Sequence, residues 1–275
     1  VISFKKQYPA WLYPGESDKD HSPKRLKVPA EYILSPLNPF TWWKTLRSIR
    51  NFQPEQVILP WWVTFWGPAF SRIIAGLKRS QIPVTMLIHN TLPHEARFID
   101  KFLARRTLKV ADRYIVMTQK EKAKLGSLLP GAQKIRIAPL PIYNAFKETK
   151  QSHNETRRSL GLLESAPVIL FFGFVRPYKG LDILIEAFTL LAEKINSAQL
   201  LIVGEFWDDK ASYLSMINDL GLQDQVQIHD NYIPDDAVAP YFKTANVFAA
   251  PYVGGTQSAA LKTALGFGLP AVATQ

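Results

Sequence analysis

The chain has 275 residues, of which 47% are hydrophobic, so it has enough apolar material for two domains with buried cores and too much for a disordered or fibrous protein. It contains no cysteine, which excludes disulfides and thiolate metal sites, and no apolar run is long enough to span a bilayer. The formal net charge is +10.

The first half of the chain alternates between strand-like and helix-like segments joined by short loops. Strands are expected at residues 1–4, 56–61, 83–89, 113–118 and 134–139, helices near 40–51, 66–79, 95–109 and from 119, and a polar loop over 7–29. Repeated strand–helix units of this kind predict a doubly wound, mainly parallel sheet.

The alternation is interrupted at residues 139–154, where prolines and polar residues predict a linker, and then resumes. Strands are expected at 167–172, 199–204, 226–230, 246–252 and 270–274, and helices at 181–195, 210–220, 235–245 and from about 256. The sequence therefore predicts an α/β protein with two Rossmann-like domains, residues 1–145 and 155–275, facing across a cleft. It begins inside a strand and stops just past one, so we expect a further strand–helix unit before the first domain and a further segment after the second.

The charge is unevenly divided between these halves. Residues 1–150 carry 25 Lys and Arg against 10 Asp and Glu, a net +15, whereas residues 151–275 carry 8 against 13, a net −5. Six of the seven tryptophans also lie in the first half: Trp11, Trp42, Trp43, Trp61, Trp62 and Trp66. We expect most of them to be core residues, but the basic and aromatic bias as a whole favours a polyanion or an anionic membrane surface as partner.

The segment FFGFVRPYKG joins an apolar strand to a long amphipathic helix. It places Arg176 and Lys179 at the carboxyl end of a strand, where open α/β sheets bind ligands. Two cations there, with a helix amino terminus behind them, suit a diphosphate. A solvated basic turn is an equally weighted interpretation of this segment by itself.

A second segment, PYVGGTQSAALKTALGFGLPAVAT, repeats the arrangement. Gly254 and Gly255 permit a tight turn, and Thr256, Gln257 and Ser258 open a helix whose free N–H groups would form an anion cradle. Ordinary helix capping by Thr256 or Ser258 is the alternative. Because both segments follow strands of one predicted sheet, together they favour a diphosphate site over two unrelated turns.

These two segments resemble the donor domain of retaining glycosyltransferases of the GT-B fold, family GT4. In the first half, SFKKQYPAWLYPG, IHNTLPHE and VADRYIVMT resemble the acceptor domain of bacterial and archaeal members. Such enzymes transfer a sugar from a nucleotide donor to an acceptor bound between the domains. The family often has two glutamates, separated by seven residues, where this chain has Gly255 and Thr263. We interpret this as a subfamily variation, in which either acidic residues elsewhere in the chain contact the donor or the hydroxyl of Thr263 and the amide of Gln257 replace the glutamates.

The resemblance implies roles for individual residues. Arg176 and Lys179 would hold the donor diphosphate and stabilise it as it leaves, and His89, at a strand end, would help to shape the active site. A histidine satisfied by its local structure is the alternative for His89, and His94 is an acceptor-side candidate. The implied donor-binding residues are Gly173, Glu205, Phe206, Tyr232, Ile233, Gly255, Thr256, Gln257, Ser258 and Thr263.

The implied activity is retaining and metal-independent sugar transfer from a UDP- or GDP-sugar, with no cofactor, to a cell-envelope polysaccharide or lipid-linked acceptor. We expect a cytoplasmic protein, peripheral on the inner face of the membrane, because the basic helix at 97–109 can add attraction to anionic lipid. The alternatives are another GT-B enzyme, either a nucleotide-sugar epimerase or a phosphorylase-like transferase, and a basic nucleic-acid-binding protein, for which no binding module is visible.

Overall fold

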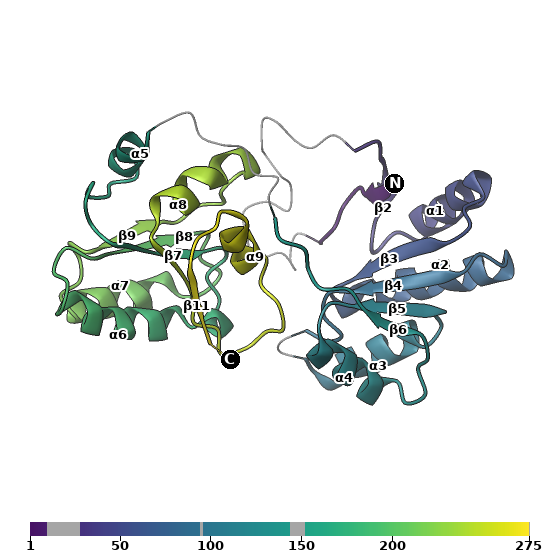
Figure 1. Ribbon diagram of the computed structural model, residues 1–275. Coiled ribbons are helices and arrows are strands. Elements are labelled where there is room, and N and C mark those ends of the chain that lie inside the picture. Colours follow the sequence, from purple (N-terminus) through teal and green to yellow (C-terminus); the bar gives the residue numbers. More distant parts are fainter. Residues whose placement is uncertain (10–27, 94–95, 144–151, 275) are drawn as a thin grey trace. The chain divides into compact units, whose positions relative to one another are not determined.

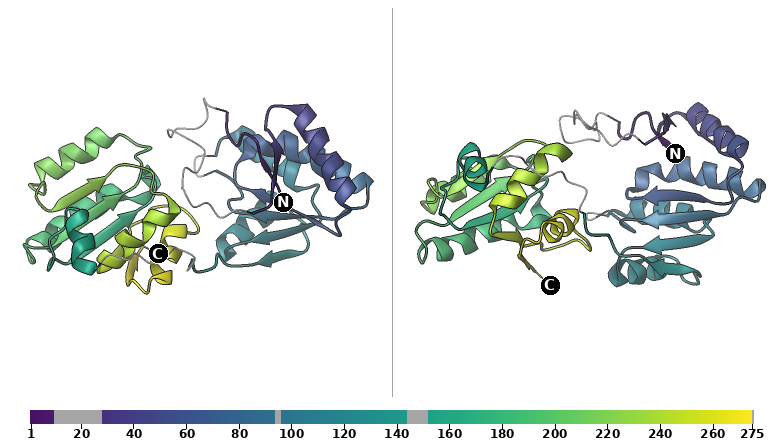
Figure 2. Two further views of the ribbon diagram at one scale, coloured as in Figure 1. Left: turned by 90° about the horizontal axis from the view of Figure 1, so that it is seen from above. Right: turned by 45° about the horizontal axis from the view of Figure 1, so that its top comes forward.

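The computed structural model describes residues 1–9, 28–93, 96–143 and 152–274 (Figure 1). The described residues form two compact units, which meet in the sequence at Leu140 and Pro141, inside the segment that the sequence predicts as the linker. Each unit has its own sheet and its own helices (Figure 2). The predicted α/β class with two Rossmann-like domains is confirmed.

The amino-terminal unit contains a four-stranded sheet in which every pair of neighbouring strands is parallel, in the order β3-β4-β5-β6. Its strands are β3 (Val57–Trp61), β4 (Val84–Ile88), β5 (Arg113–Val116) and β6 (Ile135–Ile137), and its helices are α1 (Pro39–Phe52), α2 (Gly67–Arg79), α3 (Phe98–Leu108) and α4 (Gln119–Leu128). Among the described residues, no helix is both long and apolar enough to cross a membrane.

Two short strands of this unit form a sheet of their own. Strand β1 (Ile2–Phe4) pairs in parallel with β2 (Glu31–Leu34). The sequence predicts β1 but not β2, because β2 has only four residues and its first two are exposed, so it has no buried apolar run to mark it.

Aromatic residues fill the amino-terminal core. Trp61 and Trp66 are fully buried, and Trp66 stacks on Phe70 with 5.3 Å between the ring centroids. Trp42 and Trp62 pack against the same core, whereas Trp43 is 62% exposed. The expectation that most tryptophans are core residues is therefore correct for those that the structure describes, with Trp43 as the exception; Trp11 lies outside the described residues.

The carboxyl-terminal unit is a five-stranded parallel sheet with helices on both faces (Figure 1). Its strands, in the order β11-β10-β7-β8-β9, are β7 (Val168–Phe172), β8 (Gln199–Val203), β9 (Val226–His229), β10 (Val247–Ala250) and β11 (Ala271–Ala273). Its helices are α5 (His153–Ser159), α6 (Leu181–Ala192), α7 (Lys210–Asp219), α8 (Val238–Thr244) and α9 (Ala259–Gly266). One core packs α6 and α7 against the sheet, and a second packs α8 and α9 against the opposite face.

The strand order of this sheet reverses direction at β7. The chain adds β8 and β9 on one side of β7 and then returns to place β10 and β11 on the other. Loops that leave the two strands at such a reversal diverge onto opposite faces of the sheet, and the crevice between them is the usual ligand site of open α/β sheets. The loops after β7 and β10 are therefore where the fold predicts a ligand site.

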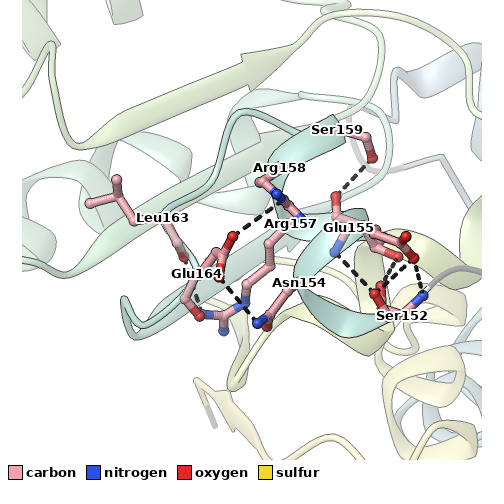
Figure 3. A network of polar contacts seen from close by, with 9 residues as sticks. Ser152, Asn154, Glu155, Arg157, Arg158, Ser159, Leu163 and Glu164 are labelled. Carbon is pink, nitrogen blue, oxygen red and sulfur yellow. Dashed lines mark hydrogen bonds and ion pairs between the residues drawn. The ribbon is translucent and has the colours of Figure 1, made fainter.

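Helix α5 is an element that the sequence does not predict, because its amino-terminal end lies in the segment interpreted as a linker. It is started by a capping box between Ser152 and Glu155 (Figure 3). Its Arg157 is only 3% exposed and donates hydrogen bonds to the carbonyl groups of Ala166 and Thr244 and to the side chain of Asn246. One buried guanidinium thus joins α5 to the segment before β7 and to the segment between α8 and β10.

We expect Arg157→Met to lower the free energy of unfolding of the carboxyl-terminal unit by about 2–4 kcal/mol, because it leaves several buried carbonyl groups without a donor. The control is Arg158→Met, which removes a 65% exposed side chain with a single ion pair to Glu164 and should cost less than about 1 kcal/mol. Urea unfolding followed by circular dichroism measures both. Equal losses in the two variants would contradict the anchoring role of Arg157.

Candidate functional site

The loops after β7 and β10 lie against each other. The two strands pair directly, and beyond them the N–H of Val253 donates to the carbonyl of Tyr178 at 2.9 Å. Gly180 has a φ of 64°, and a side chain at this position would collide with the carbonyl oxygen of Pro251. Glycine is therefore required both for the backbone conformation and for the close approach of the two loops.

A cavity of about 370 Å³ opens beside these loops, within the carboxyl-terminal unit. It is lined by eight residues that the sequence predicts as site residues: Gly173, Lys179, Glu205, Tyr232, Ile233, Gln257, Ser258 and Thr263. Arg176, Phe206, Gly255 and Thr256 do not line it. Residues from the loops after β7, β8, β9 and β10 thus come together around one cavity, although they are up to 90 positions apart in the sequence.

Lys179 is the most unusual residue of the cavity. Its side chain is only 9% exposed, and its Nζ lies 5.9 Å from the ring centroid of Phe171 and 5.8 Å from that of Tyr252. Burial, and then the nearby positive charge of Arg176, lower the pKa of Lys179 to about 8. Within the described part of the chain, this ammonium has neither an ion-pair nor a hydrogen-bond partner.

Gly173 makes the room for this ammonium. It follows β7 with a φ of 101°, a conformation that side chains rarely adopt, and a Cβ at this position would lie 2.9 Å from the Nζ of Lys179. Any larger residue would strain the backbone and displace the ammonium from the end of the strand.

Arg176 supplies a second positive charge next to the cavity. Its guanidinium lies 5.7 Å from the ring centroids of both Tyr178 and Trp207, so the two aromatic faces hold it in place. It too has no acidic partner among the residues that the structure describes. Glu205 and Asp235 also line the cavity, but among the described residues neither cation has an ion pair with them. Two like charges brought together in this way suit an anion with more than one negative group.

Helix α9 starts at the same cavity. Ser258 caps it by accepting a hydrogen bond from the N–H of Leu261, and the Ser258 hydroxyl lies 3.1 Å from that of Tyr252. The hydroxyl oxygen of Thr256 is buried and has no hydrogen-bond partner within the described residues. Thr263 donates its own hydroxyl to the carbonyl of Ala259, so towards a ligand it can act only as an acceptor.

A row of aromatic rings borders the cavity. Phe174 stacks on Trp207 at 4.2 Å and lies 6.5 Å from Tyr232, with nearly parallel planes. Phe206, which the resemblance places near the nucleoside, packs instead against Tyr213 with Lys210 over its ring. The structure therefore puts Phe174 rather than Phe206 at the cavity.

The sequence prediction missed four aromatic residues of the cavity: Phe172, Phe174, Tyr178 and Tyr252. A signal for them was present, since the first three lie inside FFGFVRPYKG and Tyr252 ends the strand segment before the second glycine turn. The charged residues of these segments indicate an anion, and the sequence by itself assigns no role to the aromatic residues between them.

His89 belongs to the other unit, where it follows β4. Its N–H donates to the carbonyl of Trp61 at 2.8 Å, and burial lowers the pKa of its imidazole. Two residues on, the N–H of Thr91 donates at 2.7 Å to the carboxylate of Glu121, which is only 1% exposed. This carboxylate fixes the loop that carries His89. His94 lies outside the described residues.

Comparisons with known proteins relate part of this chain to a family of enzymes. Residues 166–275 match the family model described as glycosyl transferases group 1. D-inositol 3-phosphate glycosyltransferase from Gordonia bronchialis is 30% identical over 158 residues, which cover 51% of this chain and 32% of the relative. A second such enzyme, from Catenulispora acidiphila, is 28% identical over 174 residues, covering 60% of this chain and 41% of the relative. The matched segments thus span less than half of these relatives' length.

Solved structures share the fold. HepE from Anabaena, in complex with UDP-glucose, aligns with a TM-score of 0.68 and 18% identity over 89% of this chain and 66% of that chain. WaaG, a glycosyltransferase involved in lipopolysaccharide biosynthesis, aligns with a TM-score of 0.58 and 16% identity over 90% of this chain and 66% of that chain.

Lys179→Met should raise the stability of the protein, because it removes a buried charge and keeps an apolar side chain of similar length against Phe171 and Tyr252. The pKa of Lys179 is lowered from 10.5 to about 8 in the folded state. The gain, on the order of 1–3 kcal/mol, should thus be complete below pH 8 and shrink as the pH rises towards 10.5, where the wild type folds with a neutral lysine.

Thermal unfolding at pH 7 and pH 9.5 measures this difference, with Lys194→Met, an exposed lysine of the same unit, as the control. A variant less stable than the wild type at pH 7 would show that the ammonium of Lys179 stabilises the fold, and would refute the prediction.

Proposed function

We propose that this chain is a group 1 glycosyltransferase of family GT4 and that it transfers a sugar from a nucleotide-diphosphate donor; the match of residues 166–275 to the family model and the GT-B fold support this. The observation that carries the proposal is the buried ammonium of Lys179, which lies beside Arg176 at the reversal point of the sheet and has no ion-pair partner among the described residues. A protein core tolerates such a charge at a cost, and a bound diphosphate offsets that cost.

The two cations would act on the leaving group. As the bond between the sugar and the diphosphate breaks, negative charge builds up on the departing phosphate. Lys179 and Arg176, already fixed by the aromatic rings around them, would stabilise this charge without having to reorganise. The first N–H groups of α9 and the buried hydroxyl of Thr256 would add neutral donors for phosphate oxygens.

The remaining contacts of the donor follow from the cavity. The faces of Phe174 and Tyr232 offer a stacking surface for a nucleoside base, with Glu205 and Ile233 on the same lining. We propose that Gln257 and Thr263, which line the same cavity, supply polar contacts to the donor sugar. For His89 we propose the role that the resemblance implies, which is to help shape the active site. We also propose that transfer retains the anomeric configuration and needs no metal ion.

For the acceptor we propose an envelope polysaccharide or a lipid-linked glycan. Two features support this choice: the net charge of +15 of residues 1–150, and the likeness of the fold to WaaG, which is involved in lipopolysaccharide biosynthesis. The proposal places the protein at the cytoplasmic face of a membrane, where it would act as a peripheral enzyme on a membrane-bound acceptor.

The donor proposal is tested with UDP-glucose and GDP-mannose by isothermal titration calorimetry on the wild type, Lys179→Met and Arg176→Gln. We expect one donor to bind to the wild type and the affinity to fall about 10- to 100-fold in each variant, since a hydrogen bond to a charged group contributes roughly 1.5–3 kcal/mol. Lys194→Met should bind as the wild type does.

Equal binding by the wild type and Lys179→Met would refute the diphosphate assignment, because the same variant is expected to be at least as stable as the wild type. Product analysis by mass spectrometry then tests the reaction. Epimerised or phosphorylated sugar, in place of a glycoside, would indicate a different reaction at the same site.

A further inference from the structure

A larger hollow, of about 850 Å³, lies on the amino-terminal unit. Helix α2 contacts both α1 and α3 and forms its floor, and α1 and α3 form its two walls. None of the residues that line it belongs to the predicted donor site, and the proposed reaction does not use it.

The groove is deep because helix α2, its floor, has small side chains where it lies between α1 and α3. Pro68, Ser71 and Ala75 line the groove between the larger side chains of Trp43 on α1 and Phe102 on α3. On the flanks, Gly67 lets Thr107 approach, since a Cβ at this glycine would lie 2.9 Å from the Thr107 hydroxyl, and Gly76 does the same for Leu46. The groove is therefore a product of the sequence of α2.

The lining of the groove is basic as well as apolar. Arg72, Arg79 and Arg106 are exposed and line it, and within the described residues none of the three has an ion-pair or hydrogen-bond partner. A fourth arginine, Arg50, is held by a hydrogen bond to the carbonyl of Gly76. The groove thus offers three guanidinium groups that no described residue pairs with, above an apolar floor.

Large apolar side chains are exposed on the two walls. Trp43 is 62% exposed and Phe102 is 56% exposed, and both line the groove. Further exposed residues occupy the first turns of the same helices: Phe40 (84%) on α1, and Phe98 (87%) and Ile99 (60%) on α3. Exposed aromatic residues gathered with basic ones are costly in water and favourable at the boundary between lipid head groups and acyl chains.

We propose that this groove is a membrane-docking site that takes an anionic phospholipid, with its phosphate among Arg72, Arg79 and Arg106 and its acyl chain along α2 between Trp43 and Phe102. Charge complementarity selects an anionic head group, and the apolar floor selects a ligand with a hydrocarbon chain. A single-stranded nucleic acid would also use the arginines and the aromatic faces, but it has no hydrocarbon chain to fill the apolar floor. The proposal rests on the proposed function for the presence of a membrane, but it requires neither donor binding nor transfer.

Co-sedimentation with vesicles tests the charge requirement without donor or acceptor. The wild type should bind vesicles of phosphatidylcholine mixed with phosphatidylglycerol and bind pure phosphatidylcholine much less. Arg72→Gln/Arg106→Gln should weaken binding about 25-fold, from about 5-fold for each basic side chain near a lipid surface. Lys122→Gln/Arg136→Gln is the matched control, because it makes the same charge change at exposed positions of the same unit outside the groove.

The apolar requirement is tested with Trp43→Ser/Phe102→Ser against Phe52→Ser, which changes an 82% exposed aromatic residue of α1 that does not line the groove. We expect the double variant to lose most of the vesicle binding and the control to keep it, with unchanged thermal unfolding in both. If Arg72→Gln/Arg106→Gln and Lys122→Gln/Arg136→Gln weakened vesicle binding equally, binding would be general electrostatic attraction and the site would be overturned. Vesicle binding by Trp43→Ser/Phe102→Ser at the wild-type level would overturn it as well. Failure of the wild type to bind anionic vesicles would also overturn the site. If the wild type then bound an acidic amphipathic peptide, the groove would be a site for a protein partner.

Discussion

The candidate donor site depends on one packing constraint, the contact between the loops after β7 and β10. Because Gly180 carries no side chain, the first loop lies directly on the carbonyl of Pro251, and because Gly173 carries none, the ammonium of Lys179 fits against the end of β7. These two contacts bury a lysine that has no acidic partner among the described residues. The same geometry that weakens the fold at this point supplies a fixed positive charge for a ligand, as is usual where function and stability compete.

The rest of the carboxyl-terminal unit keeps this contact in place. Residues of β7 and β8 are buried by cores on both faces, so these strands cannot shift without opening one of them. At the opposite end of the same strands, the N–H of Val168 donates to the side chain of Asn246, and Arg157 donates to that same side chain. The buried guanidinium therefore fixes β7 to β10 at their beginnings, and the glycines let their ends approach. The site at the carboxyl ends of β7 and β10 is therefore held rigid by the pairing of these two strands.

The sequence predicts most of the fold because buried parallel strands have continuous apolar runs and the helices between them have clear starts, as Asp209 shows by capping α7. Strand β2 was missed because it is short and half exposed. Helix α5 was missed because it starts in the segment interpreted as a linker, although Ser152 and Glu155 have the spacing of a capping box; the buried contacts of Arg157 that hold the helix are not visible in the sequence. At the site, the charged and glycine positions were predictable from their spacing. The choice between Phe174 and Phe206 was not, since it depends on which ring packs against Tyr213.

Net charge by itself is a poor guide to where this protein would bind anions. The half with a net charge of −5 contains Lys179 and Arg176, whereas the half with +15 contains the exposed arginines of the groove. The two kinds of cation differ physically. A buried ammonium is little screened by salt and acts through fixed geometry, whereas exposed guanidinium groups are screened within about 10 Å at moderate ionic strength and need apolar contacts to hold a ligand. The aromatic residues therefore have different tasks: at the cavity they orient single cations, and at the groove they supply the apolar contacts that the arginines lack.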